Sequence, residues 1–74
     1  MFKQKGKGDR FFFQALLDFN QRKWNEAVEN TEKALEKGIK NYDMGRVYAV
    51  MGYSLSKLGR KQEAVEWHKK SVDT

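Results

Sequence analysis

The four-residue run Glu-Ala-Val-Glu occurs twice, beginning at Glu26 and at Glu63, 37 positions apart in a chain of 74 residues. Residue character is also kept on both sides of these runs at the same offset. The matched pairs are Phe11 with Tyr48, Phe13 with Val50, Ala15 with Gly52, Lys23 with Arg60, Asn25 with Gln62, Lys33 with Lys70 and Leu35 with Val72. An internal repeat with a period of about 20 to 50 residues is typical of solenoid proteins, whose units stack to bury a shared core.

Each repeat has the residue spacing of two helices. In the second repeat, the residues of one helix face stand at the i, i+3, i+4 and i+7 spacing: Tyr48, Met51, Gly52, Leu55 and Leu58. Gly38 and Gly59 are expected to end helices, because glycine readily adopts the left-handed conformation of a C-terminal cap. Asn41 and Asp43 are both candidate N-caps of the third helix. We therefore expect four helices, at residues 9–21, 24–37, 43–58 and 61–72.

Large and small residues follow a similar order in the two repeats. The second repeat reads Tyr48-x2-Met51-Gly52-x2-Leu55-x3-Gly59-x4-Ala64-x3-His68-x2-Ser71, and the first reads Phe11-x3-Ala15-x8-Trp24-x2-Ala27-x6-Ala34. This order resembles that of the tetratricopeptide repeat (TPR) family. The resemblance implies an all-α protein, a right-handed stack of two TPR-like helix-turn-helix hairpins (an α-solenoid fragment), with repeats at about residues 8–41 and 45–74.

The small residues of this pattern have a physical role in helix packing. Ala15 and Gly52 would bring the first helix of each hairpin close to Ala27 and Ala64 on the second helix. A glycine within a helix costs about 1 kcal/mol relative to alanine, so close packing is the most economical explanation of Gly52. Trp24 resembles the large residue that plugs the turn between the two helices.

Four features depart from the family pattern. Lys61 stands where a counterpart of Trp24 is expected, and Asp18 stands where a tyrosine is usual. The usual proline after the second helix is missing, and three extra residues fall around Gly38 to Asp43. A plain four-helix bundle is the alternative architecture.

The resemblance implies a non-enzymatic module that binds a protein or peptide in a concave groove lined by the first helix of each hairpin. The groove positions are Asp9, Phe12, Leu16, Phe19 and Asn20 in the first repeat and Arg46, Ala49, Tyr53, Ser56 and Lys57 in the second. We expect an amphipathic or acidic partner, because Arg46 and Lys57 flank the apolar groove positions. The alternative role of Phe12, Leu16 and Phe19 is packing against the third helix or the N-terminal residues.

Apolar residues at both ends of the predicted stack indicate self-association. The last helix carries Val65, His68 and Val72 on the side that would meet a third repeat, with Trp67 beside them. At the other end, no preceding repeat covers Phe13 and Leu17. Terminal repeats of solenoids need a polar outer face. Two copies could pair by two-fold symmetry, as a dimer that joins like ends, or they could stack head to tail. Alternatively, the N-terminal residues or a further part of a longer protein cover these apolar patches.

Catalytic and metal-binding patterns are missing from the sequence. The chain has one histidine, His68, which is expected to be packed, and no cysteine, a set too small for the usual zinc site. Four glutamates on the second helix are interleaved with lysines in the manner of a solvated helix face: Glu26, Glu29, Glu32 and Glu36. We therefore expect no enzymatic activity, no metal and no cofactor.

The formal net charge is +5, and residues 1–10 contribute most of it through four basic residues and one acid. Residues 1–8 are expected to form a flexible basic tail ahead of a domain at residues 9–74. Nucleic-acid binding is the alternative function, through the basic residues Lys3, Lys5, Lys7, Arg10, Lys57, Arg60, Lys61, Lys69 and Lys70. No apolar run of about 18 residues and no signal-peptide pattern is present, so we expect a cytoplasmic protein without a membrane partner.

Overall fold

The structure is a computed structural model, and it describes residues 6–73. These residues form four α-helices and no strand: α1 (Asp9–Asn20), α2 (Trp24–Lys37), α3 (Met44–Lys57) and α4 (Lys61–Asp73). The predicted all-α class is confirmed, and the four predicted ranges agree with the observed helices to within one residue at each end.

The helix ends follow the predicted capping residues. Gly38 and Gly59 have φ angles of 98° and 82°, in the left-handed region that glycine adopts without cost. Asp43 is the N-cap of α3, and its carboxylate accepts a hydrogen bond from the Arg46 backbone N–H at 3.2 Å. Arg22 also has a positive φ, 62°. Arg22 and Gly59 are 37 residues apart, which is the repeat offset. The positive φ angle is therefore repeated at equivalent positions although the residue type differs.

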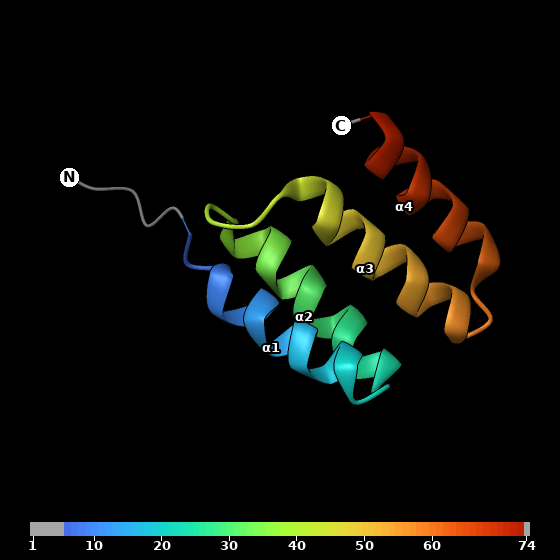
Figure 1. Ribbon diagram of the computed structural model, residues 1–74, viewed down its shortest axis with the longest axis horizontal. Coiled ribbons are helices and arrows are strands. Elements are labelled where there is room, and N and C mark those ends of the chain that lie inside the picture. Colours follow the sequence, from blue (N-terminus) through green and yellow to red (C-terminus); the bar gives the residue numbers. More distant parts are fainter. Residues whose placement is uncertain (1–5, 74) are drawn as a thin grey trace.

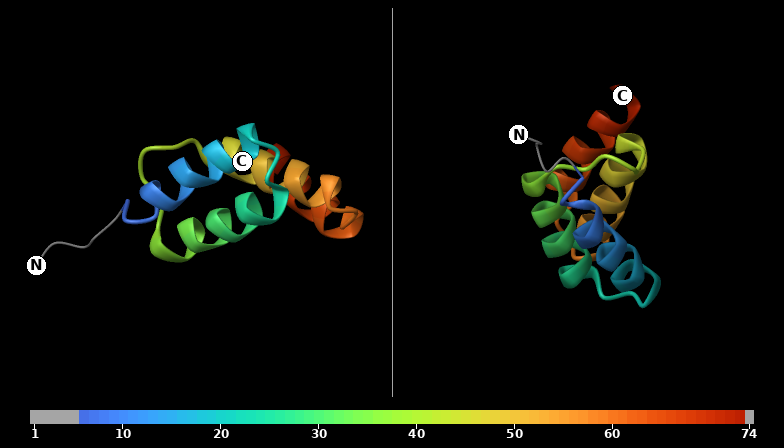
Figure 2. Two further views of the ribbon diagram at one scale, coloured as in Figure 1. Left: turned by 90° about the horizontal axis from the view of Figure 1, so that it is seen from below. Right: turned by 90° about the vertical axis from the view of Figure 1, so that its left-hand side faces the viewer.

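The helices form two antiparallel hairpins that lie side by side (Figure 1). The middle helix α2 packs against both α1 and α3, whereas α4 packs against α3 alone among the four helices. Two further views show α1 and α2 side by side as an antiparallel pair (Figure 2). In a closed four-helix bundle, the fourth helix would also pack against the first. The described helices therefore form an open row.

The core consists of two clusters that meet at Leu35, which packs against both. Their buried members are Phe12, Ala15, Ala34, Val47 and Val50 in the first and Val28, Met51, Leu55 and Ala64 in the second. Both clusters combine residues of α3 with residues of α2. The contact between these two helices thus connects the hairpins.

The loop of residues 38–43 lies against the first turn of α1. The Lys40 backbone N–H donates to Asp9 Oδ1 at 2.9 Å, and Asn41 Nδ2 donates to Asp9 Oδ2 at 2.7 Å. Asn41 therefore binds α1 instead of capping α3. The Tyr42 ring meets the Phe12 ring edge to face, with centroids 4.9 Å apart. The extra residues that depart from the TPR pattern thus fold over the start of α1.

Part of the predicted flexible tail belongs to this same contact. Residues 1–5 lie outside the described residues, whereas residues 6–8 form a turn that leads into α1. Gly8 is buried, and its N–H donates to the Gly38 carbonyl at 2.8 Å. A Cβ atom at Gly8 would collide with the Ala34 carbonyl. A glycine is therefore needed where the start of α1 meets the end of α2.

Substitutions of Gly52 test the packing of α3 on α4. A Cβ atom there would lie 2.8–3.0 Å from the His68 ring, which is the far end of an exposed side chain and can rotate away. We expect a small effect of Gly52→Ala, because a helix-propensity gain of up to about 1 kcal/mol opposes the displacement of His68. Gly52→Leu should lower the free energy of unfolding by about 2 to 3 kcal/mol through overpacking. Urea denaturation measures both.

The His68→Ala background is the control for this experiment. Without the imidazole ring, Gly52→Ala should become stabilising, whereas Gly52→Leu should stay destabilising because its branched end still reaches α4. Equal unfolding free energies for the Ala and Leu variants would contradict the close approach of α3 and α4.

Candidate functional site

Three aromatic rings from three helices meet at one end of the first hairpin. Phe19 lies in the last turn of α1, Trp24 begins α2, and Tyr53 lies on α3. Their ring centroids are 5.3 Å apart for Phe19 and Tyr53, 5.5 Å for Phe19 and Trp24, and 5.6 Å for Trp24 and Tyr53. All three contacts are edge to face, the geometry that the aromatic quadrupole favours. We call Phe19, Trp24 and Tyr53 the three-ring cluster.

The three-ring cluster is partly open to solvent. Tyr53 is 44% exposed, and Phe19 and Trp24 are half-buried. Lys57, one helical turn after Tyr53, places its Nζ 5.3 Å from the centroid of the Tyr53 ring. An ammonium group over an aromatic face is electrostatically favourable. The exposed surface therefore combines aromatic edges with a positive charge.

Both acids of α1 are engaged in hydrogen bonds within the molecule, and α3 has no acid. Asp18 is buried, and its carboxylate accepts from Gln14 Nε2 at 3.1 Å and from Asn30 Nδ2 at 2.8 Å. Asp9 binds the 38–43 loop, as described above, and α3 contains no acid. The charges that α1 and α3 leave to a partner near the three-ring cluster are consequently basic.

The structure brings some of the predicted groove residues together and separates others. Phe19, Tyr53 and Lys57 meet in the three-ring cluster and beside it. Leu16 is half-buried against the core, while Asn20 and Arg46 are exposed. Of the wider groove positions, Ala49 is half-buried and Ser56 is exposed.

The prediction of Phe12 as a groove residue was wrong. Its side chain is fully buried, since Tyr42 and the 38–43 loop cover it, and it belongs to the core. Asp9 is likewise engaged by that loop. The loop thus restricts the accessible groove to the end of α1 that carries Phe19.

Sequence reasoning missed the place of Trp24 in this site. The resemblance assigned Trp24 to plugging the turn, whereas its ring also contacts Tyr53 on the second hairpin. A usable signal was its position five residues after Phe19, across the short turn between α1 and α2, which puts both rings at the same end of the hairpin.

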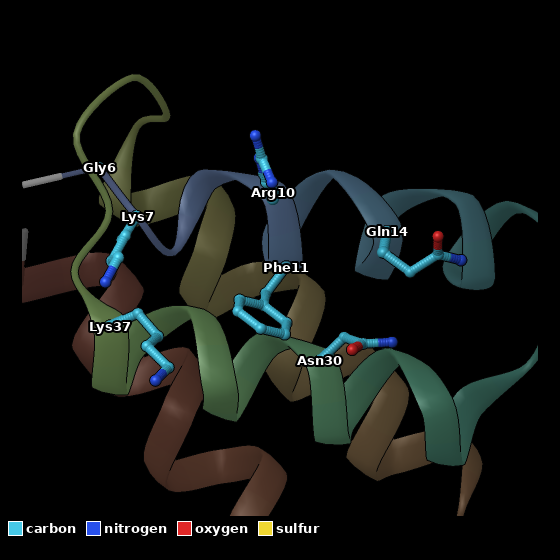
Figure 3. Close-up of a pocket in the computed structure, with 7 residues that line it drawn as sticks. All are labelled: Gly6, Lys7, Arg10, Phe11, Gln14, Asn30 and Lys37. Atoms are coloured by element: carbon cyan, nitrogen blue, oxygen red, sulfur yellow. The ribbon is translucent and has the colours of Figure 1, made fainter. Parts of the chain in front are cut away.

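A hollow lies between α1 and α2 on the other side of the first hairpin (Figure 3). Its volume is about 780 Å³, and its lining residues are Gly6, Lys7, Arg10, Phe11, Gln14, Asn30 and Lys37. The ring of Phe11 extends from α1 toward α2, between Lys37 and Asn30 (Figure 3). Three cations and one aromatic ring therefore line a single hollow.

The repeat explains why this hollow exists. At the equivalent place in the second hairpin, 37 residues later, Tyr48 packs on Trp67 with ring centroids 5.7 Å apart. The first hairpin has Phe11 in place of Tyr48, but it has Asn30 in place of Trp67. The smaller Asn30 side chain leaves open the space that an indole fills in the second hairpin.

The residues predicted for self-association divide into two groups. Val65 is 52% exposed and Val72 is 85% exposed, and both line a shallow groove with His68 and Lys69. His68, predicted to be packed, lies against Gly52 but is also exposed. Trp67 does not line that groove: it packs on Tyr48, with Lys70 Nζ 4.0 Å above its ring.

Within residues 6–73, no three His, Cys, Asp or Glu side chains gather closely enough to hold a metal ion. None of the described helices has both the length and the apolar character needed to cross a membrane.

Comparisons of the chain with protein-family models, curated proteins and solved structures found no match.

Acid denaturation tests the contact between Asp9 and the 38–43 loop. Hydrogen bonds from the Lys40 backbone, and then from Asn41, hold the pKa of Asp9 below its ordinary value of 3.8. A carboxyl group with a lowered pKa stabilises the fold above its unfolded pKa, and this stability is lost as the pH falls through the folded value. We expect Asp9→Asn to lose less stability than the parent chain between about pH 5 and pH 3, measured by urea midpoints.

Glu63→Gln is the matched control for this variant, because Arg60 lowers the pKa of Glu63 as well. Both variants should therefore weaken the acid dependence. Only Asp9→Asn should speed hydrogen exchange at the backbone amide of Lys40. An acid dependence identical to that of the parent chain would show that Asp9 does not hold the loop in solution.

Proposed function

We propose that this chain is a non-enzymatic protein-interaction module of the TPR-like kind, which binds an acidic peptide at the three-ring cluster. The TPR-like assignment is supported by the sequence repeat, by the matching positive φ angles of Arg22 and Gly59, and by the open row of helices. A right-handed stack of two such hairpins agrees with these features. The three partly exposed rings beside Lys57 are the observation that carries the binding site.

The aromatic rings and the positive charge of the site favour an acidic peptide with apolar side chains. Aromatic anchors in partly buried positions supply most of the energy of typical protein interfaces. The edges of Tyr53 and Trp24 would bury an apolar side chain of the peptide, and Lys57 would pair with a neighbouring carboxylate. Because both acids of α1 are already engaged and α3 has none, no free acid on these helices would repel a negatively charged peptide. Arg46 lies on the same stripe of α3, eleven residues before Lys57, and extends the positive charge along it.

Binding of a designed peptide tests this function. The probe is a labelled synthetic peptide with two leucines one helical turn apart and glutamates elsewhere, and its counterpart carries lysines in place of the glutamates. We expect the acidic peptide to bind and its lysine counterpart not to bind. Tyr53→Ala should weaken it about tenfold or more, as for a typical anchor residue, and Lys57→Ala should weaken it and reduce its salt dependence. Fluorescence anisotropy measures these affinities.

Two variants control for effects on folding. Ser56→Ala changes an exposed residue next to Lys57 and should bind like the parent chain. Phe12→Ala should lower the free energy of unfolding by about 3 to 5 kcal/mol, because Phe12 belongs to the core. Equal affinity for the acidic and the basic peptide, or unchanged affinity in Tyr53→Ala, would place the function elsewhere.

The hollow beside Phe11 favours a second candidate function, the binding of single-stranded nucleic acid. A base that stacks on the Phe11 ring would occupy the space that Trp67 fills in the other hairpin. Lys7, Arg10 and Lys37 would then meet the phosphates. Stacking on an aromatic side chain contributes about 1 to 3 kcal/mol per base, and phosphate contacts make such binding depend strongly on salt.

Filling the hollow tests the second candidate. Asn30→Trp copies Trp67 and should abolish binding of a labelled oligothymidylate, while Arg10→Ala should weaken it and flatten its salt dependence. Circular dichroism checks that Asn30→Trp stays folded, since this variant also loses the hydrogen bond to Asp18. An oligothymidylate that fails to bind at low salt, or that binds the Asn30→Trp variant equally well, would contradict this candidate.

A further inference from the structure

The repeat makes it possible to compare covered and uncovered copies of the same helix face. On α2, Val28 and Thr31 are 4% and 0% exposed, and Val28 packs with residues of α3. Their counterparts on α4, 37 residues later, are Val65 and His68, and both are exposed, Val65 by 52%. The face of α2 that α3 covers is therefore repeated on α4, where the described residues leave it open.

The complementary face shows the same relation at the other end of the row. On α3, Val50 and Ser54 are 7% and 0% exposed, and Val50 packs with residues of the first hairpin. Their counterparts on α1 are Phe13 and Leu17, which are 56% and 39% exposed. The molecule thus presents one half of its own inter-hairpin contact on α1 and the other half on α4.

We propose that a second copy of this chain covers these faces by head-to-tail stacking, with α1 of one copy packed on α4 of the next. In this arrangement, α4 of one copy and α1 of the next would pack in the same way as α2 and α3 within one copy. Phe13 and Leu17 take the places of Val50 and Ser54 and meet Val65 and Val72 of the neighbouring copy. This contact does not use the three-ring cluster, so it goes beyond the proposed function and is independent of it.

Charge favours head-to-tail stacking over a two-fold dimer that joins like ends. Lys69 lines the groove on α4, and a two-fold contact between α4 helices would bring two copies of Lys69 together. Like charges brought together at an interface are costly.

A head-to-tail contact uses different faces of the two partners, so it leaves one free face at each end. Such heterologous contacts continue into open filaments unless their rotation closes a ring. The average mass should therefore rise with protein concentration beyond that of a dimer.

Two single variants and their mixture test this arrangement. Phe13→Glu disrupts the α1 face, and Val65→Glu disrupts the α4 face; both positions are exposed, so the helical fold should persist in circular dichroism. Each variant alone should sediment as a monomer of 8.7 kDa at tens of micromolar. Mixed in equal amounts, the variants should form a dimer of about twice that mass, because each supplies the face that the other lacks.

Other results would overturn the proposal. If the parent chain stays monomeric at hundreds of micromolar, the faces do not pair. If Val65→Glu dissociates a dimer that Phe13→Glu leaves intact, two α4 helices pair by two-fold symmetry. If the mixture stays monomeric, α1 and α4 are not partners. If Phe13→Glu or Val65→Glu unfolds, Leu17→Glu and Val72→Glu provide a second pair of variants. Gln62→Glu is the control: it adds the same charge on α4 outside the groove and should leave the mass of the assembly unchanged.

Discussion

The two hairpins are held together at α3, chiefly by its contact with α2 and to a lesser extent by its contact with α1, because α4 packs against neither helix of the first hairpin. Leu35 packs against both core clusters, so the side chains of this contact belong to one continuous core. Thr31 and Ser54 are fully buried, and Thr31 donates its hydroxyl to the Ala27 carbonyl at 2.7 Å. Small side chains at this contact allow the two helices to approach closely, as Ala and Gly do within each hairpin.

The 38–43 loop determines which part of α1 is covered and which part stays exposed. Its extra residues bind Asp9 and cover Phe12, so the start of α1 becomes core. The end of α1 lies beyond the reach of this loop, and there Phe19 meets Trp24 and Tyr53. The extra residues that depart from the repeat pattern thereby divide α1 into a half that belongs to the core and a half whose Phe19 lies in the partly exposed three-ring cluster.

The helices and their ends could be predicted from the sequence, because helical periodicity and glycine caps are local properties. The burial of Phe12 could not, since it depends on where a loop some thirty positions away folds back. The positive φ angle of Arg22 could not be predicted either, because the residue at this position is not a glycine. For the candidate site, Phe19, Tyr53 and Lys57 were found through the family pattern. The contact of Trp24 with Tyr53 was missed because it joins two hairpins; the sequence signals only that Trp24 and Phe19 lie at the same end of the first hairpin.

The two repeats have matching helices but differ at the residues around Phe11 and Tyr48. Trp67 closes the second hairpin over Tyr48, whereas Asn30 leaves the first hairpin open over Phe11 and donates its amide to Asp18 instead. Asp18 replaces the large residue expected there, and its buried carboxylate needs that donor, since an unpaired buried charge is costly. In the first hairpin, the hydrogen-bonded pair of Asp18 and Asn30 therefore stands where the second hairpin has the apolar residues Leu55 and Trp67, and a hollow lined with cations lies beside this pair.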